Sequence, residues 1–266
     1  MSINRAIETQ IQNLVKTMPA LPQTADHIYR ICQSYNVQAG SLYKLICLDP
    51  FIFCHTQALF NSYFPKLNER FYSIAEIIIM LNINTVKNYI VPFAQTTHEG
   101  ILGKTISKNF IEANNKLFLH SVAVGITSRF IAGLRGVDAL QFEYYYSAGF
   151  LHDIGKFFFI EEAGHSEVGQ VALKQMSLYS GLQNVIAFHH DALKFSGKDA
   201  EIVRTVALAD CWVKRKLELK MDSCEPKFEN ALINKLELNQ AIFNQLENLV
   251  PNELKRVSTF IKSGAV

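Results

Sequence analysis

The sequence predicts an all-α fold. Helix-start patterns recur along the chain, and no convincing run of alternating strands with Asn-Gly or Asp-Gly turns is found. Glycine, which weakens helices, is scarce at first: Gly40 is the only glycine among the first 99 residues. Apolar residues make up 49% of the 266 positions and charged residues 19%, so the chain has the composition of a globular protein with a sizeable core.

The N-terminal region contains two clear helix starts. Asp49 offers an N-cap carboxylate before Pro50, whose missing N–H costs nothing at the first helical position. Ser73 and Glu76 form a capping-box pattern before an apolar run. A looser stretch at 96–104, with two glycines, then marks a boundary.

This boundary divides the chain into three parts. Residues 1–98 are expected to form an N-terminal helical bundle, and residues 105–216 a second helical subdomain. Residues 217–266 read as amphipathic helices that close the fold.

In the second region, histidines fall at the buried positions of predicted helices. His120 shares a helical face with apolar residues, so its ring is expected to point inward. His152 follows an apolar helix in which Ala148 and Gly149 allow close approach of another helix or a ligand, and Gly155 is expected to end that helix. His189 and His190 close another apolar helix, LQNVIAFHH.

Asp210 is the most informative single residue. It lies on an otherwise apolar helical stripe, formed by Val203, Val206, Ala207 and Val213. A carboxylate on such a face is costly unless it is paired or binds a metal. The basic run 213–216 that follows suits the negative end of a helix dipole.

A single buried histidine is more often a hydrogen-bonded core residue than a metal ligand. A set of seven candidates with an adjacent His-Asp pair reverses that preference, because imidazole and carboxylate together suit Fe, Mn, Zn or Ni. We therefore predict a site for one or two divalent ions. Its candidate ligands are His120, His152, Asp153, His165, His189, His190 and Asp210. The other histidines, His27, His55 and His98, are interpreted as ordinary core or surface residues.

Charge, cysteine content and hydropathy exclude several classes of protein. A net charge of +2 gives no strong nucleic-acid signal. The five cysteines have no CxxC spacing and are expected to be reduced, buried thiols. The first residues do not resemble a signal peptide, and uninterrupted apolar runs fall far short of the ~20 residues that span a bilayer. We expect a cytoplasmic protein that does not bind membranes.

The motifs together resemble a known family. LHDIGK (151–156), with His120 upstream and Asp210 downstream, resembles the HD superfamily of metal-dependent phosphohydrolases. The wider pattern is similar to its HDOD (HD-related output domain) branch in bacterial signalling, and it covers about residues 12–216. The remaining motifs are MPALPQT (18–24), LDPFIFCHTQALFNS (48–62), SIAEIIIMLNINTVKNYIV (73–91), GHSEVGQVAL (164–173), FHH (188–190) and LAD (208–210).

The resemblance implies an N-terminal bundle packed on an HD-type helical domain, and a regulatory role exerted on a signalling protein partner. It also implies roles for the candidate residues. His120, His152, Asp153 and Asp210 match the ligands of the first metal in HD enzymes, whereas His165, His189 and His190 match the extra ligands of two-metal relatives, with Asp153 as the bridge. Lys156 matches a phosphate-contacting lysine of the HD-GYP phosphodiesterases, so Lys156 and Asp153 are the catalytic candidates.

The chain departs from these relatives at three points. No Gly-Tyr-Pro follows His190, which argues against hydrolysis of cyclic dinucleotides. Lys116 stands where some relatives carry a carboxylate, and a cation there disfavours a third metal. The segment 157–164 is short, which is expected to open the site or displace His165.

Two functions therefore stay open. One is a regulatory HDOD protein whose metal site is structural or senses a ligand. The other is a metal-dependent phosphohydrolase with a phosphate or nucleotide ligand. We favour the regulator.

Overall fold

The computed structural model describes residues 3–34, 36–67, 70–102, 108–158, 160, 163–216 and 224–263, and every regular element in them is a helix. This confirms the predicted fold class. The first half contains α1 (Arg5–Thr17), α2 (Pro22–Gln33), α3 (Ala39–Ile46), α4 (Pro50–Tyr63), η1 (Pro65–Leu67), α5 (Ile74–Leu81) and α6 (Ile83–Leu102). The second half contains α7 (Lys108–Leu134), η2 (Ala139–Gln141), α8 (Phe142–Leu151), η3 (Ile154–Phe158), α9 (His165–Gln175), α10 (Ser180–Phe188), η4 (His189–Asp191), α11 (Ala200–Lys216), α12 (Pro226–Lys235) and α13 (Gln240–Ser263).

Both predicted helix starts are confirmed. Ser73 and Glu76 form a complete capping box at α5. The Asp49 carboxylate caps α4 by accepting from the N–H groups of Phe51 and Ile52, each at 3.0 Å. Its other oxygen accepts from the N–H of Leu21 at 2.7 Å and from the Thr24 hydroxyl. The fully buried Asp49 therefore joins the starts of α2 and α4, which gives the 18–24 and 48–62 motifs a structural role.

The stretch 96–102 is helical, so the loose segment predicted there is wrong for these residues. The α6 helix continues through Gly100 because its inner face is packed: Ala94 and Thr97 are buried, and the Thr97 hydroxyl donates to Ala20 O at 2.6 Å. Packing of this kind outweighs the helix penalty of one glycine. The rest of the predicted loose segment, at 103–104, lies outside the described residues.

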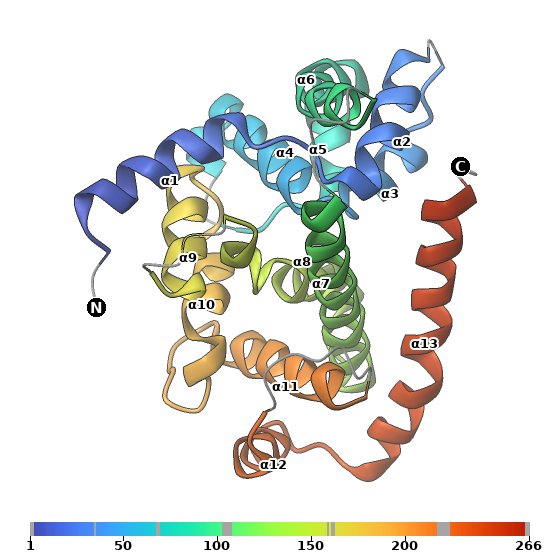
Figure 1. The fold of residues 1–266 in the computed structure, drawn as a ribbon. Helices are drawn as coiled ribbons and strands as arrows, with labels where there is room; N and C mark the ends of the chain where they lie inside the picture. The colour runs from blue at the N-terminus through green and yellow to red at the C-terminus, as the bar shows by residue number, and fades with distance from the viewer. Residues whose placement is uncertain are drawn as a thin grey trace.

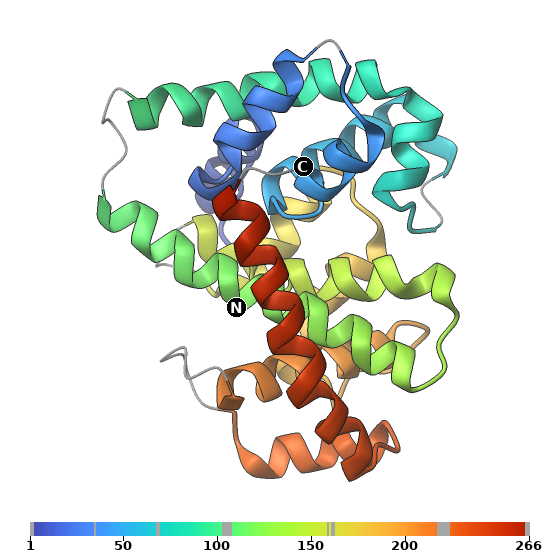
Figure 2. The same ribbon diagram turned by 90° about the vertical axis from the view of Figure 1, so that its right-hand side faces the viewer.

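The two terminal helices connect the halves of the molecule. In Figure 1, α1 lies beside α9, and the Gln175 side chain donates to Glu8 O at 3.1 Å. Figure 2 shows α13 crossing from the α12 end of the molecule to the N-terminal helices. It packs on α7 and α2, and His27 Nε2 lies 2.7 Å from Ile261 O. One hydrophobic core runs through both halves.

The α7 helix contains a 20-residue segment, Asn115–Leu134, that is apolar enough to cross a membrane by length and composition. The bent pair α5 and α6 passes the same criterion only if it is taken as one span. Of the α7 window, 67% is buried inside the protein, which is the behaviour of a core helix. Its apolar character is therefore explained by packing against α8, α11 and α13.

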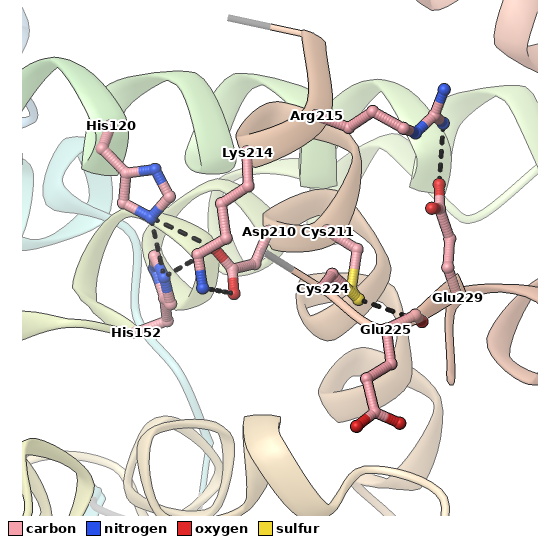
Figure 3. The surroundings of a disulfide bond; sticks show 9 residues. All are labelled: His120, His152, Asp210, Cys211, Lys214, Arg215, Cys224, Glu225 and Glu229. Carbon is pink, nitrogen blue, oxygen red and sulfur yellow. Dashed lines mark hydrogen bonds and ion pairs between the residues drawn. A yellow bond between two sulfur atoms is a disulfide. The ribbon is translucent and has the colours of Figure 1, made fainter. Parts of the chain in front are cut away.

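Cys211 and Cys224 form a disulfide, with their Cα atoms 5.2 Å apart (Figure 3). The prediction of reduced thiols is therefore wrong for these two residues. They meet because α12, which begins just after Cys224, packs back on α11. The remaining cysteines, Cys32, Cys47 and Cys54, are free and buried, as predicted.

Candidate metal centre

Helices distant in sequence bring the predicted metal-type side chains to one place. His120 lies within α7, and Asp210 lies on α11, which packs against α7. His152 and Asp153 directly follow α8. The other three are at the start of α9 or just after α10: His165, His189 and His190. Figure 3 shows His120, His152 and Asp210 pointing toward one another.

The cluster has a closed end and an open end. His120, His152 and Asp153 are completely buried, and Asp210 is only 5% exposed. By contrast, the ring of His190 is exposed. Two buried carboxylates are unfavourable without compensating positive charge.

The first group of donor atoms comprises His120, His152 and Asp210. His120 Nε2 lies 3.3 Å from His152 Nε2 and 3.1 Å from Asp210 Oδ1. His152 Nε2 and Asp210 Oδ1 are 3.6 Å apart. Two donors that hold one ion at about 2.1 Å stand roughly 3.0 to 3.5 Å from each other. These separations therefore fit one face of a coordination polyhedron.

The second group comprises Asp153, His165, His189 and His190. His165 Nε2 lies 3.1 Å from Asp153 Oδ1 and 3.0 Å from His190 Nε2. His189 Nε2 is 3.7 Å from the same carboxylate oxygen. His165 is thus within reach of the other donors, so the short 157–164 segment does not displace it.

Asp153 connects the groups because its two oxygens face different ones. Oδ2 lies 3.3 Å from His152 Nε2 and 3.5 Å from His120 Nε2. Oδ1 faces His165 and His189 of the second group. The single carboxylate of Asp153 is therefore within reach of both donor groups.

Hydrogen bonds fix the outward-facing nitrogens of two rings. His152 Nδ1 lies 2.7 Å from Gly149 O, and His189 Nδ1 lies 2.9 Å from Ile186 O. A carbonyl accepts only from an N–H, so each Nδ1 carries a proton and each Nε2 faces the cluster, where it could bind a metal once it is unprotonated. Within the described part of the chain, the buried atoms Asp153 Oδ1, His189 Nε2 and Asp210 Oδ1 have no hydrogen-bond partner. Unsatisfied, inward-facing lone pairs are what a cation would satisfy, so the donor set fits a metal ion.

The two buried carboxylates favour positive charge on His152, whereas His189 is held neutral. Burial alone would lower the pKa of His152, but the carboxylates of Asp153 and Asp210 raise it to about 9. Burial would raise the pKa of Asp153, yet His152, His120 and His165 hold it well below its usual range. Burial and the neighbouring His152 lower the pKa of His189. A metal ion would have to displace the proton of His152, so its affinity should fall as the pH falls.

Two lysines lie beside the donor groups. Lys156 Nζ is 2.6 Å from Asp153 Oδ2, and Lys214 Nζ is 2.7 Å from Asp210 Oδ2. The sequence interpretation singled out Lys156 but assigned the 213–216 run only to the helix dipole, and so missed Lys214. The signal was present as an Asp-Lys pair four residues apart, one turn along a helix.

Gly155 positions the second group, and its predicted role was wrong. The α8 helix already ends at Leu151, whereas Gly155 lies inside η3. A Cβ at this position would stand 1.8 Å from His165 O and 2.8 Å from Gly169 N. The absence of a side chain therefore lets the start of α9 lie directly against η3, which brings His165 toward Asp153.

We expect Gly155→Ala to destabilise the protein by about 3 kcal/mol, since the added methyl group overlaps a backbone carbonyl. It should also shift His165 and lower the amount of metal bound. Gly164→Ala is the matched control, because a Cβ there meets no atom within 4 Å; its cost at the N-cap should stay below about 1 kcal/mol. Urea unfolding and metal analysis test both variants. Equal stability of the two would contradict the packing role of Gly155.

Comparison with known proteins identifies the family. The model of the HDOD domain matches residues 18–193. The chain belongs to the HDOD domain family. No curated protein is similar enough to match. The predicted family is thus confirmed, and the match includes all the candidate ligands except Asp210.

Two solved structures share this HDOD fold. The MmoQ response regulator of Methylococcus capsulatus Bath has a TM-score of 0.66 at 16% identity, over 86% of this chain and 97% of that one. A virulence factor of Campylobacter jejuni has a TM-score of 0.63 at 15% identity, over 93% of this chain and 97% of that one. At such identities the similarity shows the fold alone.

Proposed function

We propose that this protein is a regulatory HDOD protein of bacterial signal transduction that binds divalent metal. The observation that carries the metal assignment is the position of Asp153, whose oxygens face two separate groups of buried donors. The regulatory assignment is supported by the match to the HDOD domain over residues 18–193. It is also supported by the fold shared with a response regulator.

Seven residues would hold the metal. His120, His152 and Asp210 would bind one ion, His165, His189 and His190 a second, and Asp153 would bridge them. Histidine and carboxylate donors accept Fe, Mn, Zn or Ni. In the regulator, the centre would stabilise the packing of α7, η3, α9 and α11, and a signalling protein partner would recognise the surface of the folded chain.

Phosphohydrolysis is the second candidate function, and the two lysines favour it. When bound, divalent ions would supply Lewis acidity toward a phosphoryl group and make water more acidic. Lys156 and Lys214 each hold a charged amine beside a donor carboxylate, where it could pair with the oxygens of a phosphate or nucleotide ligand. Asp153 would position the metal centre, and the Lys156 amine would offset the negative charge of the bound phosphate.

Metal analysis of the purified protein, combined with a hydrolysis screen, tests the proposal. We expect one or two transition-metal ions per chain, and no turnover of p-nitrophenyl phosphate, bis-p-nitrophenyl phosphate, nucleotides or cyclic dinucleotides. A partner protein captured by the wild-type chain should also be captured by a folded His152→Ala variant. This result is expected because the partner would bind the protein surface and would need no chemistry at the metal.

Two results would contradict the regulatory proposal. Turnover that is lost in Asp153→Ala but kept in Asp199→Ala would select the hydrolase, because Asp199 is a buried aspartate outside the donor cluster. A wild-type protein that binds no divalent metal would refute the metal centre itself.

A further inference from the structure

A cavity lies apart from the candidate metal centre. It is an open pocket with a volume of about 820 Å³, lined mainly by residues of α3, α7, α8 and α13. None of its lining residues is a candidate metal ligand. Arg129 of its wall follows His120 on α7 by about two and a half helical turns, which places the two side chains on opposite faces of that helix. The volume falls in the range of small-molecule sites.

Aromatic rings from three parts of the chain form much of the wall. Tyr43 belongs to α3, Phe142 and Tyr146 to α8, and Phe260 to α13. The tyrosine hydroxyls already donate elsewhere, Tyr43 to Glu143 at 3.1 Å and Tyr146 to Cys47 O at 2.9 Å. These rings therefore offer apolar surface to a ligand, and a flat ring system would stack on them.

Positive charge exceeds negative charge on the α13 side of the cavity. Arg129 and Arg256 share one carboxylate, that of Glu253, at 3.6 and 3.1 Å. Lys44 adds a further cation to the lining. Glu143 is the second acid of the lining, and its carboxylate already accepts from the Tyr43 hydroxyl and from Ile74 N. Two guanidinium groups with one acid between them suit a phosphate or carboxylate.

We infer that this cavity binds a small ligand that combines a planar aromatic ring system with one anionic group, of about the size of a nucleoside monophosphate. The ring lies among the tyrosine and phenylalanine side chains, and the anion pairs with Arg129 and Arg256. Because α13 lies beyond the residues matched by the HDOD model, the site is built partly by this chain's own C-terminal segment. A bound ligand would touch all three parts of the chain and stabilise their arrangement.

Calorimetric titration of the full chain tests this site, with AMP and GMP as phosphate probes and salicylate as the carboxylate probe. We expect one molecule of either the nucleotides or salicylate to bind per chain and raise the melting temperature. Adenosine, which lacks the anion, and inorganic phosphate, which lacks the ring, should each bind at least about tenfold more weakly. Binding of the nucleotides would identify the anionic group as a phosphate, and binding of salicylate would identify it as a carboxylate.

Variants separate this cavity from the metal centre. Arg256→Gln should weaken binding of the probe at least about tenfold, Arg256→Lys should weaken it less, and Val257→Trp should block the cavity. Asp153→Asn should leave this binding unchanged. All variants are compared only after circular dichroism shows native helix content. Absence of binding by every probe at millimolar concentration would overturn the inference. Loss of binding in Asp153→Asn alone, or phosphate binding as tightly as AMP, would also overturn it.

Discussion

Asp153→Asn is expected to abolish binding of metal by both donor groups. The substitution keeps the shape of the side chain but removes its negative charge and replaces one oxygen with an N–H donor. Both groups place an imidazole within 3.3 Å of an Asp153 oxygen, so neither is independent of this residue. Loss of an outer-shell partner alone weakens metal binding by about 10- to 100-fold, and loss of a shared ligand should exceed that.

The measurements are metal content and the rise in melting temperature on adding Mn²⁺ or Zn²⁺. An ion that binds only the folded state stabilises it in proportion to the logarithm of the metal concentration over Kd, so this rise should disappear in the variant. Asp199→Asn serves as the control, because Asp199 is also a buried carboxylate but accepts from Asn184, away from the donors. Wild-type metal content in Asp153→Asn would show that Asp153 is not a ligand.

Local chemistry explains why much of the fold could be predicted. The helix caps at Asp49 and Ser73 involve only groups up to three residues along the chain, so the sequence alone shows them. Asp210 could be placed in the interior because its helix neighbours form an apolar stripe, and the structure confirms that it is buried. Motif order then identified the family, and with it the segments that had to meet.

Other features depend on contacts that local patterns do not reveal. The closeness of Gly155 to His165 O arises from how α9 returns across η3, and a glycine after a helix is as consistent with a helix end as with such a contact. The spacing of Asp210 and Lys214 is compatible with an ion pair on one helix face, but the side-chain positions are what show that the pair forms. Pairing of cysteines likewise cannot be deduced from sequence. The role of the seven residues as metal ligands stays a prediction that metal analysis decides.

Reduction of the Cys211–Cys224 disulfide is expected to lower the free energy of unfolding by about 3 kcal/mol. The bond closes a loop between residues 13 positions apart, and a cross-link of this length removes roughly that much conformational freedom from the unfolded chain. Cys211 also follows Asp210 directly, so the bond ties α11 to the start of α12 beside the candidate metal centre (Figure 3). A reducing cytoplasm would keep both cysteines as free thiols, so the protein would have the lower stability there.

Urea unfolding with and without dithiothreitol measures this difference. Cys224→Ala should show the lower stability under both conditions, whereas Cys54→Ala, which alters a free buried thiol, should keep its response to the reductant. Thiol titration of the unfolded, oxidised wild-type chain should detect three of the five cysteines. A count of five would show that the bond does not form, and among the described residues packing and the ion pair of Arg215 with Glu229 would then hold the end of α11 to α12.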